Sequence, residues 1–167
     1  MADTLNVLVI TSPLGPLRLV SNGQALVRIE FAGRHGSDGE PRRDAVLDLA
    51  ERELAEYFEG RRRAFDIPLD AGGTAFQTRV WGALRDIPYG ELRSYRDIAE
   101  VLEKPRAVRA VGAANGRNPL PIVVPCHRVI GSNGQLTGFA GGLSVKEQLL
   151  RLEGITRDWS GNRATGS

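Results

Sequence analysis

The chain has 167 residues, of which 41% are hydrophobic, so it is long enough for one ordinary domain or for two small lobes with real cores. No stretch approaches the roughly 20 uninterrupted apolar residues of a membrane span, and the first six residues lack the pattern of a signal peptide. One cysteine cannot form an internal disulfide, and one cysteine with two histidines is a poor supply for a structural zinc site. We therefore expect a cytoplasmic protein without membrane contact, metal or other cofactor, whose thiol stays reduced.

The net charge of +2 is unevenly distributed along the chain. Residues 1–73 carry 9 Arg against 12 Asp and Glu, whereas residues 74–155 carry 11 Lys and Arg against 7 acids. No carboxylate stands between Lys104 and Lys146. A basic stretch without acids is typical of a surface that faces a polyanion such as DNA, although a solvated arginine-rich surface would give the same count.

The first part of the sequence, residues 1–70, predicts a small α+β lobe. Three short β-type runs, separated by turn residues, stand at 6–10, 17–20 and 25–31. The dipeptide Asn22-Gly23 between the last two runs is a strong hairpin signal. The sequence therefore predicts an antiparallel sheet at the start of the chain.

One helix completes this lobe. After a loop at 33–41, apolar residues at helical spacing predict a helix over 44–58, which Gly60 ends. A further strand is expected at 65–69, and residues 71–73 have the composition of a linker.

Residues 74–154 predict a second, mostly helical domain, and the composition of 155–167 is typical of a loose tail. Capping-box spacing occurs twice, at the expected starts of the first and the last helix of this domain: Thr74 with Gln77, and Ser144 with Glu147. Together with the first lobe, this pattern predicts an α+β protein of two domains.

Two short helices in the middle of the second domain predict a helix-turn-helix, similar to that of winged-helix proteins. Ser94 would cap the first helix, which runs to Leu102, and Pro105 would begin the second, which stops near Gly116. Paired short helices are more often plain packing elements. Here the outer surface of the second helix carries one arginine, Arg109, among small residues, which would let the helix approach a narrow groove closely.

The only cysteine, Cys126, follows a β-type run at 120–124 and precedes His127 and Arg128. A thiol becomes a good nucleophile when a neighbouring imidazole or cation promotes loss of its proton. A lone cysteine is most often a buried small hydrophobe, but the basic surroundings favour a reactive one. Neighbours in an extended strand point to opposite faces, so a turn or a water would have to connect the imidazole with the sulfur. Glu153 is a carboxylate that could orient His127 as a base.

A series of short segments distributed over residues 74–154 matches one known family. The matching segments are Phe76-Gln77 with Val80-Trp81, Ile87-Pro88-Tyr89-Gly90, Ser94-Tyr95, Arg106 to Gly112, Asn115 to Pro119, Pro125 to Gly131, Gly138 to Gly142, and Lys146 to Glu153. On these segments the chain resembles the O6-alkylguanine-DNA alkyltransferases, also called methylated-DNA-protein-cysteine methyltransferases. The first lobe matches the family only in outline, and there residues 12–17 resemble the early hairpin of the family.

The resemblance implies DNA repair by direct reversal of damage. The alkyl group of O6-alkylguanine in double-stranded DNA would pass irreversibly to the sulfur of Cys126, once per molecule, after the damaged nucleotide has been flipped out of the helix. By the same resemblance, His127 is the base that reaches the thiol through a water, Glu153 orients His127, and Asn118 is the hinge of the active-site loop. Tyr95 helps to rotate the phosphate of the nucleotide, and its hydroxyl could protonate the departing base.

The resemblance also implies a DNA surface and a base pocket. Arg109 resembles the finger that enters the base stack when the nucleotide leaves it. The other implied DNA contacts are Tyr95, Ala107, Ala110, Gly112, Ala113, Arg117 and Arg128. The implied base pocket consists of Val129, Phe139, Ala140, Gly141 and Lys146. Phe139 stands where many members have tyrosine and Ala140 where some have serine, so ring stacking and backbone N–H groups replace two hydroxyl contacts.

Three other functions remain open at this point. A binding-only relative would bind alkylated DNA without transferring the alkyl group, but such relatives lack the acceptor cysteine that this chain has. A transcription regulator with a reactive thiol would need a sequence-specific operator, and a cysteine hydrolase built on Cys126, His127 and Glu153 would turn over repeatedly. We expect a monomer, and we leave open its cooperative assembly on DNA, its range of alkyl groups and its action on O4-alkylthymine.

Overall fold

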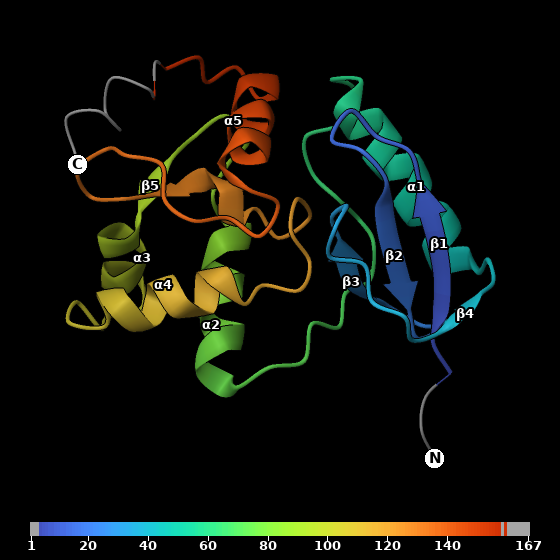
Figure 1. The fold of residues 1–167 in the computed structure, drawn as a ribbon. Coiled ribbons are helices and arrows are strands. Elements are labelled where there is room, and N and C mark those ends of the chain that lie inside the picture. The colour runs from blue at the N-terminus through green and yellow to red at the C-terminus, as the bar shows by residue number, and fades with distance from the viewer. Residues whose placement is uncertain (1–3, 158, 160–167) are drawn as a thin grey trace. The chain divides into compact units, whose positions relative to one another are not determined.

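The computed structural model describes residues 4–157 and 159, and the chain divides into two compact units between Gly72 and Gly73 (Figure 1). The first unit is a sheet with one helix, and the second is mostly helical. The α+β class predicted from the sequence is confirmed. Within the described part of the chain, no helix is both long and apolar enough to cross a membrane.

The sheet of the first unit is built from local hairpins. Its strands are β1 (Asn6–Ile10), β2 (Leu17–Ser21), β3 (Leu26–Glu30) and β4 (Glu40–Pro41), in the order β3-β2-β1-β4. The first three pair antiparallel, as predicted. Asn22 makes the turn between β2 and β3, because its side-chain oxygen accepts hydrogen bonds from the backbone N–H groups of Gln24 and Ala25.

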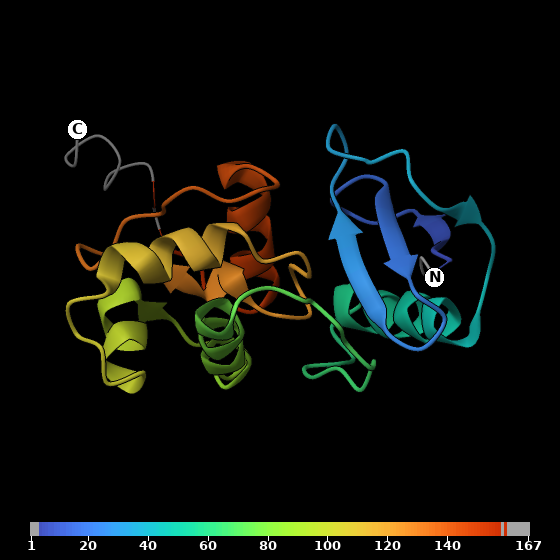
Figure 2. The same ribbon diagram turned by 90° about the horizontal axis from the view of Figure 1, so that it is seen from below.

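Helix α1 (Ala45–Phe58) packs against one face of this sheet (Figure 2). Asp44 is the N-cap of this helix, because its carboxylate accepts a hydrogen bond from the Leu47 N–H at 2.7 Å. Leu47 and Leu54 are fully buried, so the amphipathic pattern correctly identified the face that meets the core.

Two expectations for this unit are wrong. Residues 65–69 form no strand but a single bridge from Leu69 to Leu26, because Pro68 has no N–H to extend the ladder. The fourth strand, β4, lies instead at the end of the expected loop at 33–41, and it pairs parallel to β1.

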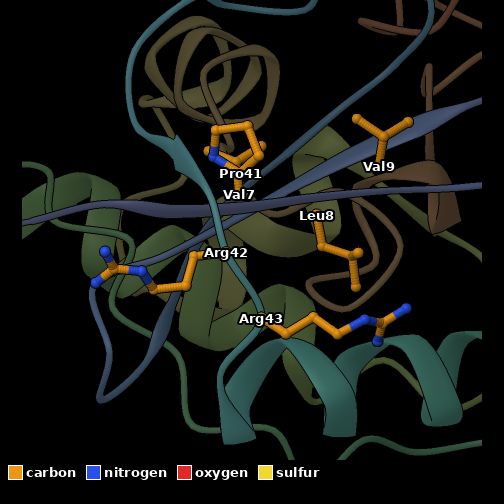
Figure 3. A pocket seen from close by; sticks show the side chains of 6 residues that line it. All are labelled: Val7, Leu8, Val9, Pro41, Arg42 and Arg43. Atoms are coloured by element: carbon orange, nitrogen blue, oxygen red, sulfur yellow. The ribbon is translucent and has the colours of Figure 1, made fainter.

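The short β4 leaves part of the β1 edge uncovered, because only Asn6 and Val7 have partners there. A shallow pocket lies at this edge, and Figure 3 shows the residues that line it: Val7, Leu8, Val9, Pro41, Arg42 and Arg43. Arg43 is held at the rim by Asp48 and Glu51, each 2.8 Å from its guanidinium. This pocket belongs to the first unit and is not part of the unit that carries the cysteine.

The second unit consists of short helices and one small sheet. Its elements are α2 (Ala75–Arg85), β5 (Arg93–Ser94), α3 (Tyr95–Val101), α4 (Val108–Gly116), the 3-10 turn η1 (Cys126–Arg128), β6 (Val129–Ile130) and α5 (Leu143–Leu152). The predicted capping box of Thr74 and Gln77 is present at the start of α2. Strands β5 and β6 pair in parallel, which brings the start of α3 beside the residues that follow the cysteine.

Helices α3 and α4 pack against each other and against α2 (Figure 1). Ser94 caps α3 as predicted, through a capping box with Asp97. Helix α4 begins at Val108, later than expected, because Lys104 to Ala107 first form a turn closed by the Ala107 N–H.

Two further expectations for the second unit are wrong. Ser144 does not cap α5, because the helix begins at Leu143, two residues earlier than such a cap requires, with Gly142 at the cap position and a φ of 95°. The run at 120–124 is not a strand but a series of turns, since Pro121 lacks an N–H and the Val124 N–H returns to the Leu120 carbonyl at 2.9 Å.

The loose tail expected at 155–167 falls largely outside the described residues. Within them, Trp159 is 4% exposed and Ile155 packs against the same apolar cluster, whose other buried members are Ile130, Leu136 and Leu150. These two side chains therefore contribute to the packing of the second unit.

Candidate active site around Cys126

Cys126 begins the turn η1 and lies in the most continuously buried part of the chain. All residues from Pro121 to Ile130 are buried, and Cys126 itself is 5% exposed. Burial raises the pKa of its thiol, while a hydrogen bond with the Asn118 side chain and the charge of Lys146 lower it. The resting thiol is thus held protonated, and its activation requires a base.

Asn118 braces the loop that leads to the cysteine. Its side-chain nitrogen donates to the Val124 carbonyl at 2.9 Å, and its side-chain oxygen accepts from the Leu120 N–H at 2.9 Å. Between these two contacts Ile122 adopts a φ of 75°, which is rare for a β-branched residue. The side chain of Asn118 therefore maintains a strained backbone next to Cys126.

The structure brings His127 and Glu153 together, a contact that the sequence spacing could not establish. His127 Nε2 lies 2.7 Å from Glu153 Oε2, and both side chains are completely buried. The other ring nitrogen of His127, Nδ1, is buried and has no hydrogen-bond partner in the described structure. Burial lowers the pKa of His127, although Glu153 opposes this effect, so the ring is neutral near pH 7. A neutral ring that donates Nε2–H to Glu153 carries its lone pair on Nδ1.

Arg128 is not on the DNA surface where we expected it, because it is 5% exposed and its donors are used inside the protein. Nε and Nη2 contact the two oxygens of Glu153 at 2.8 and 3.0 Å, and Nη1 donates to the Ile87 carbonyl at 2.7 Å. Glu153 Oε1 also accepts the Gly90 N–H at 3.0 Å. Arg128 therefore holds Glu153 in place and neutralises its charge.

Lys146 is completely buried, and its amine ties two segments together. It donates to the Val129 carbonyl at 2.7 Å and to the Thr137 carbonyl at 3.3 Å. Burial lowers its pKa to about 8, while the charge of the Cys126 thiolate acts in the opposite direction. Lys146 thus connects the strand after the cysteine with the loop that contains the other expected pocket residues.

The remaining expected pocket residues differ in exposure. Val129 is completely buried, whereas Phe139 and Gly141 are half-buried and Ala140 is exposed. The loop between Gly138 and Gly142 therefore presents its surface at the edge of the site, with Val129 behind it.

Tyr95, the first residue of α3, connects α4 with the loop before Gly138. Its phenol hydrogen-bonds with the Thr137 hydroxyl. Burial raises the pKa of this phenol, the charge of Cys126 adds to that effect, and the Thr137 and Asn115 side chains lower it. The phenol is therefore protonated at neutral pH and is able to donate a hydrogen bond.

Helix α4 presents the expected small, basic surface. Its inner face packs through Val111 and Ala114, and the Ala114 carbonyl accepts the indole N–H of Trp81 at 2.9 Å. Its outer residues are exposed or half-buried: Ala107, Arg109, Ala110, Gly112, Ala113 and Arg117. At the start of the helix, a depression is lined by Lys104, Pro105, Arg106 and Ala107. These residues combine small side chains with the positive charges of lysine and arginine, which suits the groove and the backbone of DNA.

Two family models and several curated relatives match the chain. The DNA binding domain of 6-O-methylguanine DNA methyltransferase matches residues 75–155, and the ribonuclease-like domain of the same family matches residues 8–71. The methylated-DNA–protein-cysteine methyltransferase of Methanosarcina barkeri is 47% identical over 154 residues, which are 87% of this chain and 94% of the relative. The corresponding protein of Mycobacterium tuberculosis is 47% identical over 150 residues, 86% of this chain and 89% of its own.

The chain belongs to the 6-O-methylguanine DNA methyltransferase family. Solved structures of this family have the same fold. The O6-methylguanine methyltransferase of M. tuberculosis superposes with a TM-score of 0.83 at 43% identity, over 93% of this chain and 96% of the other. An M. tuberculosis structure in complex with DNA superposes with a TM-score of 0.82 at 45% identity, over 90% and 92% of the two chains.

Several residues of this methyltransferase site were not identified from the sequence. Thr137 has no charge and lies in no matching segment, and only its hydrogen bond with Tyr95 marks it. Asn115 begins a matching segment, but no role was assigned to it. Arg128 was assigned to DNA because it is basic and follows the cysteine. The one available signal was the length of the surrounding apolar run, which predicts that a charged residue there has buried partners.

Proposed function

We propose that this protein repairs DNA by transferring the alkyl group of O6-alkylguanine to the sulfur of Cys126. The observation that carries the proposal is the buried hydrogen bond between His127 and Glu153, which leaves Nδ1 of His127 without a partner in the residue that directly follows a thiol in need of a base. Membership of the methyltransferase family, whose relatives are named for transfer from methylated DNA to a protein cysteine, supports the same reaction.

The first step activates the thiol. We infer that a water carries the Cys126 proton to Nδ1 of His127, the nitrogen without a protein partner. The imidazolium that forms is stabilised by Glu153, which receives Nε2–H at 2.7 Å. Because Arg128 binds both oxygens of Glu153, this carboxylate stays ionised and keeps its orientation.

The second step transfers the alkyl group. The thiolate attacks the alkyl carbon, the S–C bond forms, the C–O6 bond breaks, and its electron pair remains on the guanine. The hydroxyl of Tyr95 protonates N3 of the base, and the proton held on His127 returns to the Tyr95 oxygen through water. The net result is a thioether on the protein and an unmodified guanine. A thioether has no good leaving path, so each molecule reacts once.

The damaged base must leave the DNA helix for this reaction, since the thiol is 5% exposed and O6 lies inside the duplex. We infer that α4 enters the groove with its small residues and that exposed Arg109 occupies the space of the flipped nucleotide. Tyr95 and Arg117 would contact the DNA backbone. Recognition through phosphates and groove shape predicts weak sequence preference and strong salt dependence.

The flipped base would be held by Phe139, whose ring stacks on it, and by the backbone of Ala140 and Gly141 near O6. Lys146 donates to the Val129 and Thr137 carbonyls, and it thereby ties together two segments that we expect to border this pocket. Lys146 and the loop that follows Thr137 thus act as its lid. We expect the protein to act as a monomer on double-stranded DNA. We also expect it in the cytoplasm, because its single thiol requires a reducing compartment.

The test is a reaction with a duplex that contains one O6-methylguanine, followed by mass measurement of the peptides. We expect one added methylene on the Cys126 peptide, at one equivalent of lesion, and none for Cys126→Ser in the same time. An unmodified thiol beside intact lesion would refute the proposal. Repeated loss of lesion per protein molecule would instead indicate a hydrolase.

A further inference from the structure

The turn at residues 87–91, between α2 and β5, contacts the candidate active site, although the reaction steps above do not use it. The Glu91 N–H closes this turn on the Pro88 carbonyl at 3.1 Å. Gly90, its third residue after Pro88 is counted as the first, has a φ of 80°, which a type II turn requires at that position. In this conformation the Gly90 N–H points at Glu153 Oε1, 3.0 Å away.

Tyr89, the residue before this glycine, contacts two neighbours of the Glu153 carboxylate. The guanidinium of Arg128 lies over its ring, with Cζ 5.7 Å from the ring centre, which is within the range of a cation–π interaction. The Tyr89 hydroxyl donates to the Leu152 carbonyl at 3.2 Å. The half-buried side chain of Tyr89 therefore packs against Arg128 and against the end of α5 that carries Glu153.

Arg128, Glu153 and the 87–91 turn form a closed set of contacts. Arg128 binds both oxygens of Glu153 and also donates to the Ile87 carbonyl at 2.7 Å. The turn and the end of α5 touch directly, because a Cβ atom added to Gly90 would lie 3.3 Å from the Glu153 carbonyl oxygen. The carboxylate of Glu153 is thus held by Arg128 on one side and by the backbone of the turn on the other.

The same turn is fixed to the segment that carries His127. Strand β5 begins two residues after Glu91, and it pairs parallel to β6, with Arg93 opposite Val129 and Ser94 opposite Ile130. Strand β6 follows η1 directly. The 87–91 turn is therefore tied both to the end of α5 and to the chain next to His127, the two parts between which the bond from His127 to Glu153 is made.

We propose that the 87–91 turn sets Glu153 against His127 and that Tyr89 is a positioning residue for the alkyl transfer. This inference rests on the proposed function, because it concerns the base that the transfer uses. Tyr89 acts through Arg128 and through the end of α5. Without its ring and hydroxyl, Arg128 and the Glu153 carboxylate can shift together, and His127 loses the orientation in which its free nitrogen accepts the thiol proton.

The experiment measures methyl transfer from a duplex with one O6-methylguanine, in single turnovers over a range of excess protein concentrations. We expect the maximal rate constant of Tyr89→Leu to be about 10-fold to 100-fold below that of wild type, because a misplaced base costs rate. The half-saturating protein concentration should not change, because DNA binding is left intact. With excess lesion, both proteins should still end at one methyl group per molecule, which shows that all molecules are active.

Three further variants separate positioning from a loss of stability. Tyr89→Phe keeps the ring next to Arg128 and should restore the maximal rate constant to within about 2-fold of wild type. Tyr57→Leu makes the same change as Tyr89→Leu at a fully buried tyrosine of the first unit, and it should leave the rate constant unchanged. Gly90→Ala places its Cβ against the Glu153 carbonyl, so it should slow transfer as well, and it carries the comparison if Tyr89→Leu does not fold.

The same maximal rate constant in wild type and in the folded variants Tyr89→Leu and Gly90→Ala would overturn this inference alone. An equal loss of rate in Tyr57→Leu would also overturn it, because the effect would then come from stability. Absence of transfer by the wild-type protein would overturn the proposed function instead.

Discussion

Arg128 binds both carboxylate oxygens of Glu153, with Nε 2.8 Å from Oε1 and Nη2 3.0 Å from Oε2. Both side chains are buried, so neither charge is screened by water. His127 hydrogen-bonds to the same carboxylate. Arg128 therefore fixes the position of Glu153, and Glu153 in turn orients His127.

Replacing Arg128 by methionine should destabilise the protein by about 3 to 5 kcal/mol, because Glu153 would be left as a buried charge without its main partner. The measurement is equilibrium unfolding in denaturant. Arg43→Met is the matched control, since Arg43 forms ion pairs at the surface, and we expect no measurable change for it. Equal stability of wild type and Arg128→Met would contradict a structural role for this pair.

The transfer rate should stay constant as the pH falls from 8 to 6.5. The pKa of His127 is lowered from its ordinary value by burial, so its ring remains neutral and able to accept the thiol proton over this range. The rate should decline only below about pH 6.5, where the imidazole becomes protonated. Single-turnover rates over pH 5 to 9 test this. A decline that begins above pH 7 would show that the base has a raised pKa.

His127→Gln should slow transfer by about 100-fold to 10,000-fold, which is the usual contribution of a general base. Glutamine can still hydrogen-bond to Glu153, so the fold should survive, and circular dichroism spectra can verify this. If the rate is unchanged in the folded variant, another group activates the thiol.

The stability of the wild type should rise with pH above 8, relative to Lys146→Met. The pKa of Lys146 is about 8 in the folded protein, mainly through burial, against 10.5 as its ordinary value. Between these values the unfolded chain holds the proton and the folded chain does not, so the free energy of unfolding increases by up to about 1.4 kcal/mol per pH unit. Unfolding curves at pH 7, 8 and 9 are sufficient. A constant difference between the two proteins would contradict the lowered pKa.

Arg109→Ala should slow repair of a duplex by about 10-fold or more, because unstacking the base costs a few kcal/mol that the inserted side chain offsets. Reaction with the free base O6-methylguanine requires no unstacking and should be affected much less. Arg52→Ala, an exposed arginine of the first unit, controls for the loss of one positive charge. Equal losses with duplex and free base would exclude a role in flipping.

Local patterns in the sequence correctly predicted those parts of the fold that depend on interactions between residues close together in the chain. The start of α1 near Asp44, the capping box at Thr74 and the turn at Asn22 each depend on residues only a few positions apart. The strand at 65–69 was predicted wrongly because Pro68 has no N–H for a ladder. The start of α4 was placed too early because the turn from Lys104 to Ala107 has no clear signal in the sequence.

For the site, the resemblance identified Cys126, His127 and Glu153, but the residues alone could not establish their contacts. The bond from His127 to Glu153 joins positions 26 residues apart, and only the packing of α5 against η1 creates it. Arg128 was assigned to the DNA surface because the sequence shows that a residue is an arginine but not whether its side chain is buried.

The ten buried residues from Pro121 to Ile130 have a consequence for the protein after it has reacted. A methyl group on the Cys126 sulfur enlarges a side chain that is 5% exposed and lies beside the strained Ile122 backbone. Enlarging a packed core residue usually costs about 1 to 3 kcal/mol. Spent molecules should therefore melt several degrees earlier than unreacted ones, and this lower thermal stability would distinguish used from active protein in a mixture, independently of any DNA.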